Sequence, residues 1–263
     1  MVVDNWPISA LVINLAHETG RMAFQAKQLD RLGIAFERIE AITPATIVPD
    51  QQDKYWQGWE RPLRVSEQAA FASHHSVWKR IAQQDQPYLV LEDDAALSRY
   101  TADFLAQFTR TDPIDYLSLE TRGRRKLFKR QSHSDRAIFR LWQDRSGAAA
   151  YVLWPTGARK LVARTANYAA LADAAICAAY ELSAWQAVPA LAIQIDRCAE
   201  FGVPVPLETV SSISSEPGPE IENLSRMAAF GYRYRRIKSQ LRMGLRMLVH
   251  RSGSSYEVVA FRK

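Results

Sequence analysis

A short apolar run that ends in three consecutive carboxylates constrains this chain more than any other feature. The run spans Tyr88 to Leu91, follows Pro87, and is followed at once by Glu92, Asp93 and Asp94. An apolar run of this length with such borders predicts a buried strand. Three adjacent acids repel one another unless a cation or hydrogen bonds compensate. Because ligands of open α/β sheets lie beyond the carboxyl ends of the strands, the acids stand where a ligand is expected.

Two interpretations of this acidic cluster are open from the residues alone. A hard divalent cation, Mn²⁺ or Mg²⁺, held by one or two carboxylates and by substrate phosphates, would balance the charge. Alternatively, the acids cap a helix or form a solvated turn. On an extended chain Glu92 and Asp94 point to one side and Asp93 to the other. We therefore predict that Asp94 is the preferred candidate for a metal ligand. Glu92 or Asp93 would be a second ligand or would contact the ribose.

The size and composition of the chain suit one large domain, or one domain with an appendage. The chain has 263 residues, of which 48% are hydrophobic. No apolar run approaches the roughly 20 residues that span a bilayer. The two cysteines, Cys177 and Cys198, have neither a disulfide framework nor metal-ligand spacing. A reducing cytoplasm is therefore the expected compartment.

The net charge of +6 is concentrated in two segments. Residues 226–251 hold eight Arg or Lys and no acid, and residues 122–136 hold seven against one acid. The remainder carries 19 basic against 27 acidic residues, so it is acidic. Local basic patches on an acidic body indicate a phosphate-bearing ligand or an anionic surface rather than a uniform coat of nucleic acid.

The order of elements predicts an α/β fold with a mostly parallel twisted sheet and helices on both faces. Strands are expected at residues 8–15, 35–39, 88–91, 115–120, 137–142, 147–154 and 189–194. Helices are expected at residues 19–32, from an N-cap at Ser66 to about Gln84, at 100–108, from Pro155, and at 172–182. Gly33 is the expected stop of the first helix. Residues 42–62 and the basic segment 122–136 are expected to be loops, the latter solvated or in contact with acidic groups of an acceptor.

Several segments occur in the order and at the spacing of one enzyme family. They are Val12–Leu15, Arg21, Leu32–Ile34, Glu37–Ile42, Ser66-Glu67, Ser73-His74, Trp78, Leu91–Asp94, Gly147–Tyr151, Gly157-Ala158 and Ala172-Asp173. From about Val12 to Ile213 the chain resembles glycosyltransferase family 25. It departs from the family pattern at Ala69-Ala70, where the family has Gly-Cys, and at Ala16, where an acid is common. The Ala16 change puts in doubt a contact of that position with the nucleotide.

The resemblance implies a GT-A-like fold and an activity. It implies transfer of galactose or glucose from a UDP-sugar, with inversion, to a lipopolysaccharide or lipooligosaccharide acceptor. The domain organisation then becomes a catalytic domain at 1–199, a linker or wrapping segment at 200–224, and a basic amphipathic tail at 225–263. The tail is either a helix on the anionic inner face of the cytoplasmic membrane or a helix packed on the domain with a solvated charged face.

Two carboxylates are candidates for the base that deprotonates the acceptor. Asp173 is the candidate by its position in the family pattern, and a helix N-cap is its alternative role. Glu120, which ends the next predicted strand, is the rival, and a solvated strand end is its alternative. Arg21 would pair with the diphosphate, and Asn14 would contact the nucleotide. Further nucleotide-side positions are Glu40, Ala41, Ser73, His74, Glu92 and Asp93. For His74, a structural network with Glu67 and direct substrate contact are both open.

Two other classes of function compete with this interpretation. A nucleotidyltransferase or phosphotransferase could use the same carboxylates, although no Walker-type glycine loop is present. A non-catalytic adaptor could bind a membrane surface or nucleic acid through the basic segments. The sequence has neither a helix-turn-helix pattern nor an RNP-like aromatic strand, which disfavours nucleic acid.

Overall fold

A βαβ unit opens the fold. In the computed structural model, which describes residues 7–131, 136–145, 147–207 and 225–263, β1 (Ala10–Asn14) runs parallel to β2 (Phe36–Glu40). The connecting helix α1 (Thr19–Leu32) ends at Gly33, whose φ of 65° is a left-handed conformation that glycine adopts without strain. The predicted helix at 19–32 and its glycine stop are confirmed.

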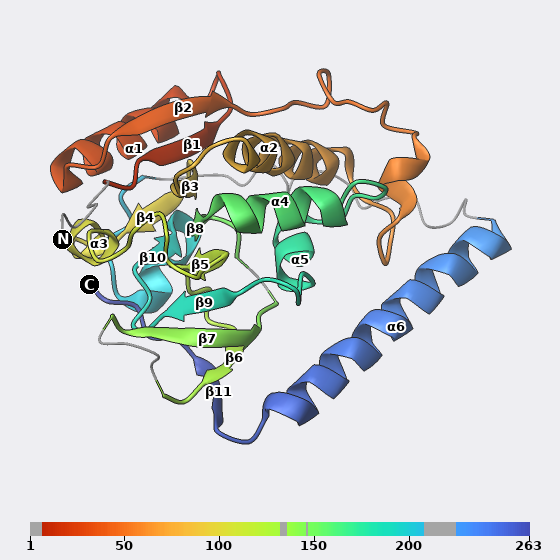
Figure 1. The fold of residues 1–263 in the computed structure, drawn as a ribbon. Helices are drawn as coiled ribbons and strands as arrows, with labels where there is room; N and C mark the ends of the chain where they lie inside the picture. Colours follow the sequence, from red (N-terminus) through yellow and green to blue (C-terminus); the bar gives the residue numbers. More distant parts are fainter. Residues whose placement is uncertain (1–6, 132–135, 146, 208–224) are drawn as a thin grey trace.

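A nine-stranded sheet forms the centre of the described chain, in the order β11-β6-β7-β9-β5-β8-β3-β1-β2 (Figure 1). Its remaining strands are β3 (Tyr88–Glu92), β5 (Tyr116–Ser118), β6 (Arg125–Lys129), β7 (Ile138–Gln143), β8 (Ala150–Leu153), β9 (Ala184–Ala187) and β11 (Ser254–Val258). Three of the neighbouring pairs are parallel and five are antiparallel. The prediction of a mostly parallel sheet is therefore wrong, and the sheet is mixed. β8 lies antiparallel between β3 and β5. The parallel sheet was predicted from the alternation of strands and helices along the chain, and that alternation does not determine the direction of a strand.

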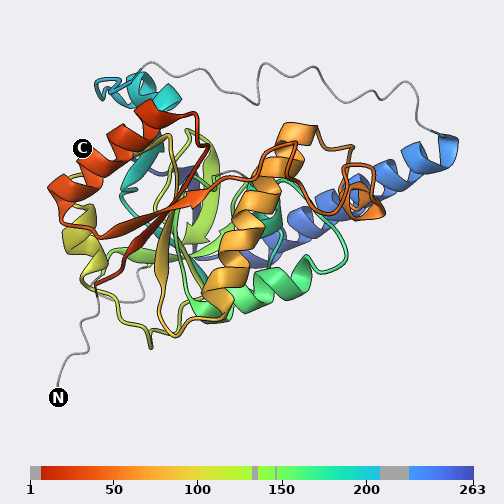
Figure 2. The same ribbon diagram turned by 90° about the horizontal axis from the view of Figure 1, so that it is seen from above.

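Helices cover both faces of the sheet, as predicted (Figure 2). On one face lie α1 and α3 (Thr101–Leu105). On the other lie α2 (Val65–Ala82), α4 (Pro155–Arg164) and α5 (Ala172–Cys177). Val12 and Leu89 pack in the core of the first face, and Leu11 and Val90 in the core of the second, because successive side chains of a strand alternate. The apolar run of β3 is apolar throughout because it is buried on both faces.

The bounds of three helices differ from prediction. α3 ends at Leu105, three residues before the predicted end at 108. α2 begins at Val65 with Arg64 as its N-cap, so the proposed N-cap at Ser66 is wrong. The Glu67 carboxylate accepts the Arg64 backbone N–H at 2.9 Å, which satisfies a donor at the helix start. α5 ends at Cys177, five residues before the predicted end at 182.

The basic segment at 122–136 is not simply a solvated loop. Residues 125–129 form β6, which pairs with β7 and β11, and Lys126 is 1% exposed. Residues 132–135 lie outside the described residues.

A second, two-stranded sheet pairs β4 (Ala95–Leu97) with β10 (Ala192–Gln194). β4 and β9 were not predicted, because three or four residues are too few to show a period.

The final segment returns to the sheet. The helix expected in the tail at 225–263 is α6 (Arg226–His250), and the strand that follows it, β11, pairs with β6. Of the predicted linker at 200–224, residues 208–224 lie outside the described residues, and the division into domains stays a prediction. Among the helices of the described residues, none is long and apolar enough to cross a bilayer.

Candidate active site

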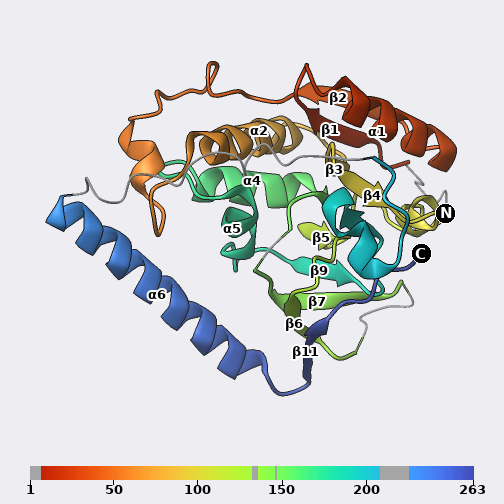
Figure 3. The same cartoon turned by 180° about the vertical axis from the view of Figure 1, so that it is seen from behind.

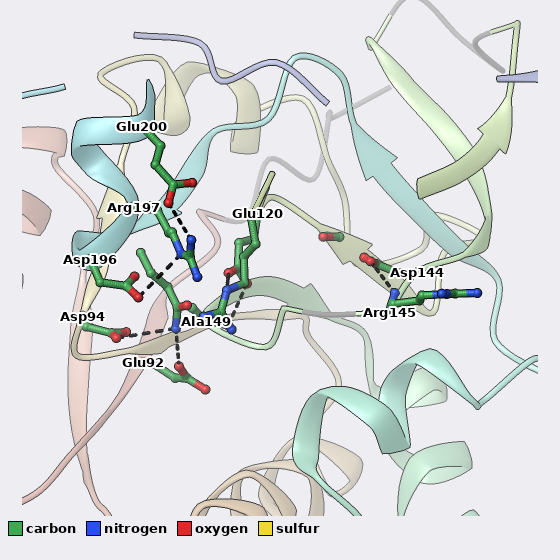
Figure 4. A network of polar contacts seen from close by, with 12 residues as sticks. Glu92, Asp94, Glu120, Asp144, Arg145, Ala149, Asp196, Arg197 and Glu200 are labelled. Atoms are coloured by element: carbon green, nitrogen blue, oxygen red, sulfur yellow. Dashed lines mark hydrogen bonds and ion pairs between the residues drawn. The ribbon is translucent and has the colours of Figure 1, made fainter. Parts of the chain in front are cut away.

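The acidic cluster lies at the carboxyl end of β3. Glu92 is the last residue of the strand, and Asp93 and Asp94 form the turn into β4. The side-chain amide nitrogen of Gln194, at the end of β10, lies 3.1 Å from Glu92 Oε2 and 3.5 Å from Asp94 Oδ2 (Figure 4). Glu92 and Asp94 therefore share one side of the turn, as the alternation of an extended chain predicts.

Asp93 points to the opposite side, toward α1. Its Oδ2 accepts from Asn14 Nδ2 at 2.8 Å, and its Oδ1 lies 3.3 Å from Arg21 Nη1. Arg38 Nε in turn donates to Asn14 Oδ1 at 2.8 Å. The structure thus brings three sequence-predicted residues together, and in it Asn14 and Arg21 hold Asp93.

Gln25, a buried glutamine that the sequence analysis did not identify, forms hydrogen bonds with the backbone of the turn at Asp93 and Asp94. Gln25 of α1 is fully buried, and its Nε2 donates to the backbone carbonyls of Asp93 at 3.1 Å and Ala95 at 2.8 Å. A polar residue on the buried face of an amphipathic helix was the available signal, because a buried amide must find hydrogen-bond partners. The backbone of the acidic turn is therefore held by the helix that follows β1.

His74 of α2 reaches the cluster from the other face of the sheet. Its Nε2 lies 3.1 Å from Glu92 Oε1, and its Nδ1 lies 3.0 Å from the Tyr151 hydroxyl. The Tyr151 hydroxyl accepts from Trp78 Nε1 at 2.8 Å. Glu67, the alternative network partner of His74, instead forms a bidentate pair with Arg61 at 2.7 and 2.8 Å. The structural network of His74 is therefore with Tyr151 and Glu92.

The other nucleotide-side candidates are Glu40, the last residue of β2, Ala41, which follows it, and Ser73 of α2. Ser73 Oγ accepts the Ile42 N–H at 2.8 Å and donates to the Ala69 carbonyl at 2.8 Å. The Ala41 N–H donates to the Asn14 carbonyl at 3.0 Å. Glu40 is exposed and pairs with Arg38 at 2.8 Å. Ser73 thus fixes the chain that follows β2 onto α2.

The two carboxylates that share Gln194 differ electrostatically. Burial, together with the charges of Glu92 and Asp93, raises the pKa of Asp94 to about 7. Burial would also raise the pKa of Glu92, but hydrogen bonds from His74 and Gln194 and the charge of Arg122 lower it. Asp94 Oδ1 is buried and has no hydrogen-bond partner among the described residues. Of these two carboxylates, Asp94 is therefore the one that a cation would stabilise more.

Glu120 lies beyond β5 and is almost completely buried. Its Oε2 accepts the Ala149 N–H at 3.0 Å, and its Oε1 lies 3.9 Å from Arg122 Nε. Burial and the charge of Glu92 raise the pKa of Glu120 to about 8. Gly147 leaves room for this carboxylate, since a Cβ there would lie 2.7 Å from Glu120 Oε2. Its φ of 109° also favours glycine.

Asp173 lies in the first turn of α5, two residues after the N-cap Leu171. Its Oδ1 accepts the Ala174 N–H at 2.7 Å, and burial raises its pKa above the ordinary value. Arg122, which sequence reasoning placed in a solvated loop, is 29% exposed, and its charge lowers the pKa values of Glu92, Glu120 and Asp173. Arg122 is thus the cation that these three carboxylates share.

A buried ion pair lies beneath Glu120. Lys126 Nζ is 2.6 Å from Asp144 Oδ2 and donates to the Glu120 carbonyl at 2.9 Å and to Gln186 Oε1 at 2.7 Å. Both charged side chains are at most 5% exposed. The pair therefore ties β6, the end of β7, β9 and the end of β5 together under the site.

The described residues hold no preformed group of three or more metal-ligating side chains. Glu92 and Asp94 are a pair, which is the number of carboxylates that Mg²⁺ commonly uses when substrate phosphates complete its coordination. The unpartnered Asp94 oxygen and the oxygen-only donor set fit a hard cation of this kind.

Comparison with known proteins places this site in a family. The model of glycosyltransferase family 25 (LPS biosynthesis protein) matches residues 8–176, which include the acidic cluster, Glu120 and Asp173. The lipooligosaccharide biosynthesis protein lic2B of Haemophilus influenzae is 27% identical over 199 residues, covering 70% of this chain and 74% of that protein. The lacto-N-neotetraose biosynthesis glycosyltransferase LgtB of Neisseria meningitidis serogroup B is 32% identical over 99 residues, covering 36% of each chain. The chain belongs to glycosyltransferase family 25.

Proposed function

We propose that this protein transfers a hexose, galactose or glucose, from a UDP-sugar to a saccharide acceptor of lipopolysaccharide or lipooligosaccharide, with inversion. Family membership supports the transferase class, and the name of the Haemophilus relative supports the acceptor class. The observation that carries the donor assignment is the buried, unpartnered Asp94 oxygen beside Glu92 at the end of β3. We also propose that the part of the chain that would bind the UDP-sugar donor has a GT-A-like fold.

Asp94 and Glu92 would hold Mn²⁺ or Mg²⁺. A bound cation of this kind would neutralise the diphosphate oxygens and stabilise the departing UDP. Gln194 keeps the two carboxylates on one side of the turn, and His74 orients Glu92. Asp93, with Asn14 and Arg21, would face the nucleotide from the α1 side, where a ribose hydroxyl or a phosphate can exchange with the existing contacts.

The acceptor hydroxyl must lose a proton as it attacks the sugar, which requires a base. We assign this role to Asp173, because its carboxylate is only half-buried and its pKa is raised toward the pH at which a base works well. Glu120 is the rival, since burial also raises its pKa, to about 8, although its side chain is only 1% exposed. Arg122 stands near both and would balance the charge that develops between donor and acceptor.

Titration calorimetry of UDP, with and without Mn²⁺, tests the donor site. We expect UDP binding that requires Mn²⁺ in the unmodified protein and disappears in Asp94→Asn. Asp103→Asn removes a carboxylate from an exposed position in α3 and is expected to leave binding unchanged. UDP binding that is equally strong in Asp94→Asn, or that needs no metal, would contradict the metal role of this cluster.

A further inference from the structure

α6 packs against the rest of the protein through its basic side chains. Arg235 donates to the carbonyls of Trp59 at 2.6 Å and Gln57 at 2.9 Å. Farther along the helix, the guanidinium of Arg246 lies 4.2 Å from the centre of the Tyr180 ring. Figures 1 and 3 show α6 as a long rod along the edge of the molecule.

The last turn of α6 is held in the same manner. The ring of His250 stacks on the ring of Trp142, with centroids 3.9 Å apart and planes 5° from parallel. Arg242 lies over the Tyr180 ring at 5.2 Å. β11 then joins the edge of the main sheet. These contacts fix which face of α6 points toward the protein.

The opposite face of α6 is apolar and exposed. Its members recur every three or four residues and fall within roughly 80° of the helix circumference. They are Met227, Phe230, Tyr234, Ile237, Leu241, Leu245 and Leu248, and each is between 48% and 85% exposed. We call these seven residues the apolar stripe. Tyr232, on the face toward the protein, is the buried residue of the helix.

This arrangement is the reverse of an ordinary surface helix, which buries its apolar side chains and exposes its charges. Scattered exposed apolar residues are common, but a continuous stripe of seven marks a surface that another apolar phase covers. In α6, Arg235, Arg242 and Arg246 instead contact carbonyls and aromatic rings of the protein. The stripe is thus left for a partner outside the described chain.

Charge beside the stripe identifies that partner. Residues 226–251 contain eight Arg or Lys and no acid. Arg226, Arg233 and Arg251 fall along one border of the stripe and Lys238 along the other, and all four are exposed. Long basic side chains beside an apolar face reach anionic headgroups while the apolar groups enter the acyl boundary. A second copy fits poorly, because a two-fold contact through this stripe would bring the same cations together.

We infer that α6 docks the protein on an anionic lipid surface, lying in the plane of the interface with its apolar stripe inserted. This inference does not rest on the transferase chemistry, because vesicle binding needs neither donor nor acceptor.

Vesicle flotation of the full chain tests the inference. The probes are phosphatidylcholine vesicles with and without phosphatidylglycerol, and the variants are Leu241→Ser, Leu245→Ser and both together. We expect binding to the phosphatidylglycerol vesicles, weakened by added salt and reduced on the order of tenfold for each leucine removed. Val48→Ser is the matched control, because Val48 is 81% exposed but lies far along the chain from α6. It is expected to bind as the unmodified protein does.

Circular dichroism and sedimentation equilibrium on the same proteins separate the outcomes. Lost vesicle binding in the double variant, with native helix content and an unchanged solution mass, supports the inference. Three results overturn it: no binding of the unmodified protein to anionic vesicles, equal binding by the double variant, or a dimer in solution that the double variant dissociates. The last would mean that a second copy covers the stripe.

Discussion

The imidazole Nε2 of His74 lies 3.1 Å from Glu92 Oε1, and 18 residues separate the two in the chain. An ionised carboxylate only accepts, so Nε2 carries a proton and donates to Glu92; in the neutral imidazole, Nδ1 then accepts from the Tyr151 hydroxyl. Trp78 donates to that hydroxyl in turn. A chain of donors thus runs from the core to the site and orients Glu92 for its neighbour Asp94.

Replacing His74 removes the middle of this chain. We expect His74→Phe to lower the free energy of unfolding by about 1–3 kcal/mol, because Glu92 and Tyr151 lose a buried partner. Chemical denaturation measures this. The matched control is His75→Phe at the next position, where the ring stacks on Phe71 and the buried Nε2 has no partner among the described residues. His75→Phe is expected to be neutral or stabilising, and an equal loss in both variants would contradict the role of the hydrogen bonds.

Because of Glu120, the free energy of unfolding is expected to fall as the pH rises from about 4.5 to about 8. Its pKa is raised from 4.5 to about 8, so the folded protein keeps a proton that the unfolded chain releases between these values. Stability from this group is therefore present below pH 4.5 and is lost as pH rises toward about 8. We expect Glu120→Gln to be more stable than the unmodified protein above pH 8, by about 2–4 kcal/mol, and to match it at low pH. Unfolding curves of both proteins at low pH and above pH 8 measure the difference in the free energy of unfolding. Equal free energies above pH 8 would mean that burial does not raise the pKa of Glu120.

Turnover separates the two candidate bases. We expect Asp173→Asn to lower kcat by on the order of 10²–10⁴-fold without weakening UDP binding, since loss of a general base removes a proton acceptor and leaves the donor site intact. Glu120→Gln is the comparison, expected to change kcat far less. Initial-rate kinetics with UDP-galactose and UDP-glucose give both numbers. A large loss in Glu120→Gln with an active Asp173→Asn would transfer the role to Glu120.

The buried ion pair under the site is expected to be costly to break. Lys126→Met leaves Asp144 charged in the core, and we expect the free energy of unfolding to fall by about 3–5 kcal/mol. Lys126→Met combined with Asp144→Leu removes both charges and should lose less. Lys129→Met, at an exposed position of the same strand, is the control for strand propensity. Equal losses in the single and double variants would show that the hydrogen bonds of Lys126 matter more than its pairing with Asp144.

Local features of this protein were readable from the sequence. The helix at 19–32, its end at Gly33 and the buried strand before Glu92 follow from short-range rules, because periodicity, a left-handed stop and an apolar run act within a few residues. The opposite directions of Asp93 and Asp94, which lie in the turn after β3, agree with the alternation expected of an extended segment. These rules also placed the acids at the end of a strand.

Features that depend on distant segments were not readable. The direction of β8 depends on its pairing with β3, some sixty residues earlier in the chain, and with β5, some thirty-five residues earlier. Lys126 looked like part of a solvated basic run, and it is buried because Asp144 and Gln186 meet it from other strands. Gln194, which bridges Glu92 and Asp94, comes from a hundred residues away.

The sequence by itself therefore determined the longer helices, the strand before Glu92, the acidic cluster and the amphipathic character of residues 226–248, since each depends on neighbouring residues. Only the tertiary structure decided that an oxygen of Asp94 is buried without a hydrogen-bond partner, that His74 contacts Glu92, and which face of α6 is exposed. Burial, hydrogen-bond partners and the local dielectric are properties of a packed neighbourhood, and that neighbourhood is assembled from segments the chain order keeps apart.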